Sequence, residues 1–129
     1  MTTWNDVKNY IHNNYKADDV QDTLLQLVFQ IDGLRSQLVF VGYDRTESGI
    51  EWVKVHSPIG LVADLDIART ASLLSEKVAG GLVIIGEKAF VTNAVPLANL
   101  DANELVEPMS LVLNVADQLE AQLLGVDTH

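Results

Sequence analysis

The apolar residues between positions 78 and 94 predict a β-hairpin with an amphipathic helix on each side of it. Residues 82–85 form a short run that is apolar on both faces, and residues 89–92 return after a reversal. Gly80 and Gly81 are expected to end the preceding helix. A strand that is apolar on both faces is not expected at a solvated surface. We expect the chain's own helices to cover one face of this strand, and a second subunit is the candidate cover for its other face.

The first part of the chain is predicted to form a helix followed by a meander of three strands. Thr3 and Asp6 resemble a capping box, and apolar residues at helical spacing continue this helix to near Asp18. Alternating apolar positions separated by turn formers then predict antiparallel strands. These strands cover residues 24–31, 34–43 and 50–57.

A second helix is predicted where the sheet pattern breaks. Pro58 and Gly60 are expected to end the third strand, because proline cannot donate to a ladder. Asp64 and Asp66 then fall in the first turn of a helix that is expected to run to the glycine pair at 80–81. Its main apolar stripe consists of Ile67, Ala71, Leu74 and Val78.

The last helix follows the hairpin. Asp101 and Glu104 are spaced for a capping box at its start. Because Pro108 removes one helical hydrogen bond, we expect either a kink there or a helix that begins near Glu107 after a separate turn. The stripe that predicts this helix consists of Leu105, Met109, Val112, Ala116, Leu119 and Leu123.

The resulting order of elements, α-β-β-β-α-β-β-α, predicts an α+β fold in which helices pack on an antiparallel sheet. The chain has 129 residues, of which 48% are apolar and 20% are charged, as is typical of globular proteins. We therefore expect a single domain over residues 1–129.

The net charge of −10 is the unusual feature of the composition. Eighteen acidic residues against eight basic ones, with no basic cluster, argue against a nucleic-acid partner. We ascribe the charge to solubility in preference to a dedicated site for basic partners. No cysteine is present, which excludes disulfides and thiol chemistry. The uncharged runs are too short to span a membrane and the N-terminal residues do not resemble a signal sequence, so we expect a cytoplasmic protein.

No constellation of residues in the sequence supports catalysis. His12, His56 and His129 lack the spacing of a zinc motif, and no serine stands in a nucleophile-elbow context. The glycines match turns and not a phosphate cradle, and the paired carboxylates fall at element boundaries, where capping explains them. We therefore expect no enzyme activity, no catalytic residue, no cofactor and no metal ion.

The C-terminal half resembles the YbjN-like proteins and the type III secretion chaperones, of which the Tir chaperone is a familiar member. The resemblance is most specific over residues 73–123. In the first half of the chain only the order of the elements matches. It rests on a helix ending LLSEKV, the turn AGG, the strands LVIIG and AFVTNAVPL, the joint ANLDANEL and the helix VLNVADQLEAQL.

This resemblance implies a chaperone-like homodimer without enzyme activity that holds an extended segment of another protein. Apolar patches and an added β-strand would hold the segment. The same resemblance implies that the dimer interface involves the second helix and the strand after it. The residues that it assigns to this interface could equally belong to the core of one subunit. They are Leu73, Leu74, Val83 and Ile85. The alternative is a regulatory or structural module that binds one folded partner protein, and a small-molecule enzyme is the third hypothesis.

Overall fold

The computed structural model describes residues 1, 3–33, 35–78 and 80–124. It has the predicted α+β architecture and the predicted succession of elements, with one further short strand near the N-terminus. In chain order the elements are α1 (Trp4–Asn14), β1 (Ala17–Gln21), β2 (Leu24–Asp32), β3 (Arg35–Arg45), β4 (Glu51–Leu61), the 3-10 turn η1 (Val62–Asp64), α2 (Ile67–Leu74), β5 (Gly81–Ile85), β6 (Lys88–Pro96) and α3 (Ala102–Leu124).

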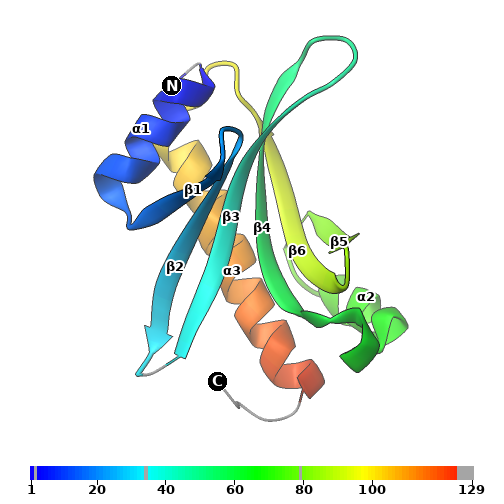
Figure 1. Ribbon diagram of the computed structural model, residues 1–129. Helices are drawn as coiled ribbons and strands as arrows, with labels where there is room; N and C mark the ends of the chain where they lie inside the picture. Colours follow the sequence, from blue (N-terminus) through cyan, green and yellow to red (C-terminus); the bar gives the residue numbers. More distant parts are fainter. Residues whose placement is uncertain (2, 34, 79, 125–129) are drawn as a thin grey trace.

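The strands form one antiparallel sheet in the order β1-β2-β3-β4-β6-β5. Figure 1 shows the long helix α3 crossing behind this sheet, with α1 beside one end of it. α3 contacts β3, β4 and β6. Because side chains alternate along a strand, only one face of the sheet packs against these helices. The fully buried core lies between them and includes Val7, Ile11, Leu25, Leu27, Val39, Val41, Val53, Val55, Val91, Leu105, Val112 and Leu119.

β1 is the strand that the sequence pattern did not predict. α1 begins with the predicted capping box, in which the Asp6 N–H donates to Thr3 Oγ1 at 3.1 Å. The helix ends at Asn14, so its predicted end near Asp18 is wrong. The residues that follow pair with β2 at the edge of the sheet. Val20 is the only large apolar residue of β1 and is 49% exposed, so no apolar alternation marks this strand in the sequence.

β4 continues through Pro58 and Gly60, so the prediction that the sheet breaks there is wrong. The pairing of β3 with β4 ends at Phe40 opposite His56, and Pro58 therefore has a ladder partner only in β6. The register with β6 shifts between Pro58 and Gly60, where the Gly60 φ is 152°. A strand that is paired on one side and carries a bulge accommodates a proline.

α2 is shorter than predicted. Its N-cap is Asp66, whose carboxylate accepts from the Arg69 N–H at 3.1 Å, and the helix ends at Leu74. Val78 lies beyond the helix and is 81% exposed, so the prediction that the helix extends to the glycine pair is wrong. Gly80 lies so close to β6 that a Cβ placed on it would be 2.8 Å from the Thr92 carbonyl oxygen.

The hairpin and the last helix follow the predictions closely. The turn between β5 and β6 contains Gly86 at a φ of 62°, which glycine adopts without strain. The Glu104 N–H donates to Asp101 Oδ1 at 2.8 Å and the Asp101 N–H donates to Glu104 Oε1 at 3.0 Å, which completes the predicted capping box. α3 runs from Ala102 without interruption through Pro108, which excludes a separate turn before Glu107. The carbonyl of Glu104, which Pro108 leaves without a helical donor, lies on an exposed residue that water can reach.

Candidate binding surface

The face of the sheet opposite α1 and α3 is here called the open face. The register places Phe40, His56 and Thr92 side by side on it, in β3, β4 and β6. From these positions every second residue of each strand points to the same side. In Figure 1 the open face is turned toward the viewer, in front of α3.

The open face is more apolar than a solvated face. An antiparallel sheet with one face in water usually alternates buried apolar with exposed polar residues. Here the second set contains eight large apolar residues among its polar ones: Leu24 and Val28 of β2, Leu38 and Phe40 of β3, Trp52 of β4, Phe90 of β6, and Val83 and Ile85 of β5. Val28 is 44% exposed and Ile85 is 51% exposed. A sheet face with this many large apolar residues is a candidate contact surface.

A shallow apolar hollow of about 220 Å³ lies on the open face, lined by Leu24, Phe40, His56, Ile85 and Phe90. The rings of Phe40 and Phe90 meet edge to face, with centroids 6.2 Å apart. His56 is only 8% exposed, its ring centroid lies 6.1 Å from that of Phe90, and its Nδ1 lies 2.8 Å from Thr92 Oγ1. Burial lowers the pKa of His56, and the nearby Lys54 lowers it further. The imidazole is therefore neutral at neutral pH, and the hollow suits apolar side chains.

The two edges of the sheet differ in chemistry. β1 carries two adjacent acids, Asp18 and Asp19, and a register shift follows them. Charges and bulges are the usual protection of an edge strand against unwanted pairing. β5 has the sequence GLVII, with no charge and no proline, and Ile84 is 49% exposed. Within the described residues β5 pairs only with β6, so its outer side presents N–H and C=O groups that no other strand pairs.

The four residues that the family resemblance assigns to a dimer interface do not form one exposed patch. Leu74 is 8% exposed and belongs to the core of the single chain, and Leu73 packs against that core. Val83 and Ile85 lie on the open face, where Val83 is opposite Phe90. Of these four positions, Ile85 is the most exposed to solvent.

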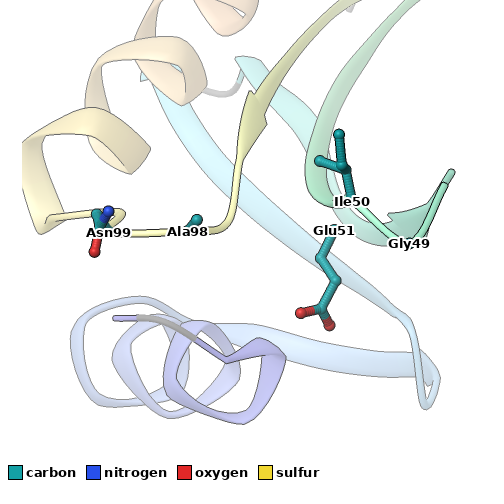
Figure 2. A pocket seen from close by; sticks show the side chains of 5 residues that line it. All are labelled: Gly49, Ile50, Glu51, Ala98 and Asn99. Atoms are coloured by element: carbon teal, nitrogen blue, oxygen red, sulfur yellow. The ribbon is translucent and has the colours of Figure 1, made fainter.

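A second hollow, of about 360 Å³, lies between the loop before β4 and the loop after β6. Figure 2 shows its lining residues Gly49, Ile50, Glu51, Ala98 and Asn99, with the Glu51 carboxylate pointing away from the Ile50 side chain. Glu51 accepts a hydrogen bond of 2.6 Å from the Tyr43 hydroxyl, and this bond raises the pKa of the Tyr43 phenol. No second acid and no histidine lines this hollow in the described structure, so it lacks an acid–base pair.

The remaining candidate residues of the sequence lie apart from one another. His12 Nε2 is 2.8 Å from Asp19 Oδ1 on the surface, and His129 lies outside the described residues. Over residues 1–124, leaving out positions 2, 34 and 79, no group of three or more potential ligand side chains is placed to hold a metal ion. Within the same part of the chain, no helix has both the length and the hydropathy needed to cross a bilayer.

Comparison with models of known protein families and with curated protein sequences finds no match. The resemblance to YbjN-like proteins and secretion chaperones therefore stays a prediction from the sequence pattern.

Proposed function

We propose that the protein is a protein-binding, chaperone-like homodimer without enzyme activity, and that it holds an extended segment of a partner protein along the outer edge of β5. The observation that carries this proposal is the contrast between the two edges of the sheet. Both β1 and β5 pair on one side only in the described sheet, but β1 has acids and a register shift, whereas β5 is uncharged and apolar.

An extended segment would complete the hydrogen bonding of β5. Its backbone would pair with the outer N–H and C=O groups, which supplies affinity without requiring a particular sequence. Its side chains would alternate between the two faces of the sheet. Those on one side would lie beside Val83 and Ile85, and those on the other beside Leu82 and Ile84. The alternate apolar positions would favour a segment with apolar residues of its own.

The polar side chains that line the two hollows also favour a binding function over catalysis. His56 Nδ1 is already bonded to Thr92 Oγ1, and the Glu51 carboxylate accepts from Tyr43. Both groups are engaged within the chain, and among the described residues that line each hollow neither has a second acid or a second histidine beside it.

Hydrogen exchange read by mass spectrometry tests the proposal. The probe is a reduced and alkylated protein that stays unfolded and offers extended segments. Exchange of the amides of residues 81–85 is expected to slow when the probe is added, while that of the central strand β3 stays unchanged. The substitution Ile84→Lys should abolish the slowing, because a lysine on an edge strand opposes pairing.

Val20→Lys is the matched control, since Val20 and Ile84 are each 49% exposed and lie on the two opposite edge strands. It should leave the slowing intact. Exchange in β5 that does not respond to the probe, or that responds equally in Ile84→Lys, would contradict the proposal.

A further inference from the structure

We propose that the second copy of the chain packs against the open face, so that two sheets stack face to face around the hollow at Phe40, His56 and Phe90. This inference rests on the homodimer of the proposed function and assigns its interface. It leaves the outer edge of β5 accessible to the extended segment.

The distribution of charge favours a second copy as the occupant. Within the described residues, the register places two acids, Asp18 and Asp44, and two bases, Lys54 and Lys88, on the open face. The face is therefore balanced, and the net charge of −10 comes from the rest of the chain. Two copies that meet through any strongly acidic surface repel each other. On the open face two copies meet without that cost.

The side chains of the open face also suit a contact between identical surfaces. An isologous contact needs a patch that is complementary to itself. Aligned sheets pack with their side chains interdigitated at a separation of about 10 Å. The open face offers both a hollow and protruding apolar side chains, among them Val28 and Ile85. His56 is buried and neutral, so its imidazole does not oppose a second apolar layer.

Substitutions at two neighbouring residues of β5, Ile84 and Ile85, distinguish a face-to-face interface from strand pairing at the edge of the sheet. Ile84 and Ile85 are 49% and 51% exposed, but successive residues of a strand point to opposite faces. Ile85 lies on the open face and Ile84 on the side that bears the helices. Each lysine substitution changes the net charge equally, from −10 to −9, so general repulsion between copies is slightly reduced in both.

The test is the molar mass by light scattering across a dilution series for the full chain and three variants. Ile85→Lys and Val28→Lys should each raise the dimer dissociation constant by on the order of 100-fold, because each would bury an unpaired charge in the interface. Ile84→Lys should leave the dissociation constant unchanged. Both face positions are about half exposed in the single chain, so lysine is compatible with folding, which circular dichroism verifies.

Each other outcome overturns the inference in its own way. If Ile84→Lys and Ile85→Lys both dissociate the dimer while Val28→Lys does not, the copies pair through the β5 edge. If all three variants stay dimeric, the interface lies on another surface. If the unmodified chain is monomeric and Val28→Lys weakens binding of the unfolded probe, the open face binds the partner segment instead. If the interface lies on another surface, a slowing of exchange in β5 by the probe would still support the segment site, so the site and the face-to-face interface fail separately. A monomeric chain would overturn both the homodimer and its interface.

Discussion

The side-chain amide of Gln37 joins β3 to β4 beyond the point where their backbones pair. Its Nε2 donates to the Pro58 carbonyl oxygen at 2.7 Å and to Ser57 Oγ at 3.0 Å. The Ser57 hydroxyl in turn donates to the Leu38 carbonyl oxygen at 2.7 Å. Gln37 is 4% exposed and Ser57 is fully buried. These side chains therefore replace the ladder that ends at His56 and hold β4 in the sheet through a proline.

Gln37→Leu should lower the free energy of unfolding by about 1–3 kcal/mol, because it leaves the buried Pro58 carbonyl and Ser57 hydroxyl with fewer partners. Urea unfolding measures this change. Gln122→Leu is the control, since Gln122 is exposed on α3 and should change the stability by no more than about 0.5 kcal/mol. Equal effects of the two substitutions would show that the Gln37 network does not stabilise the strand.

Gly80→Ala should destabilise the chain by about 1–3 kcal/mol, whereas Gly81→Ala should have a smaller effect. A Cβ on Gly80 would lie 2.8 Å from the Thr92 carbonyl oxygen and 3.1 Å from Asn93 Cα, so the backbone of β5 or β6 has to move. A Cβ on Gly81 would find its nearest neighbour, Thr92 Cγ2, at an ordinary 3.9 Å. Thermal unfolding of the pair of variants checks this, and similar melting temperatures would argue against the close approach.

Leu74→Ala should cost about 2–5 kcal/mol of stability and leave the dissociation constant of the dimer unchanged, because Leu74 is buried in the core of the single chain. Unfolding curves and light scattering on the same sample separate the two effects. Val78→Ala, at a position that is 81% exposed, should alter stability by less than about 0.5 kcal/mol. A Leu74→Ala chain of normal stability and half the mass would place Leu74 in the dimer interface.

His56 should make the protein less stable in mild acid. Its pKa in the folded state lies below the ordinary value of about 6.5, so the unfolded chain takes up a proton more readily. This contribution to stability is complete above about pH 6.5 and is lost as the pH falls through the folded-state pKa.

Urea unfolding at about pH 7.5 and about pH 5.5, at one protein concentration, measures the effect of His56. The loss of stability between the two pH values should be smaller in His56→Gln than in the unmodified chain. Other titrating groups are common to both proteins and cancel in this difference. An equal loss in the two proteins would mean that His56 is not protected from protonation by folding.

Much of the fold was predictable because its strongest signals are local. The capping boxes at Thr3 and Asp101 and the turn at Gly86 each depend on a few neighbouring residues, and all three were found where predicted. The stripe of α3 is regular enough to predict a long helix despite Pro108.

The predictions that were wrong depend on contacts between distant residues. β1 forms because β2 offers it an edge, and its own sequence carries two acids and little apolar pattern. β4 passes Pro58 because Gln37, 21 positions earlier in the chain, bonds to it. After the early end of α2, Gly80 lies close against Thr92 and Asn93 of β6. None of these relations can be seen from the residues of one segment.

The candidate surface was predictable only in part. The doubly apolar run at 82–85 indicated that a second cover is needed, and Val83 and Ile85 do lie on the open face. The hollow at His56 combines residues from five strands, and their meeting depends on the order and register of the sheet. The sequence signal for an apolar open face lies in the alternate apolar residues Leu24, Val28, Leu38 and Phe40. They belong to strands whose other face already supplies the core.

The most direct test of the account is the molar mass of the unmodified chain by light scattering after size exclusion, across a dilution series. The account predicts a mass of twice 14.1 kDa that persists on dilution until the dissociation constant is reached. A mass of 14.1 kDa at every concentration would contradict the homodimer and its face-to-face interface.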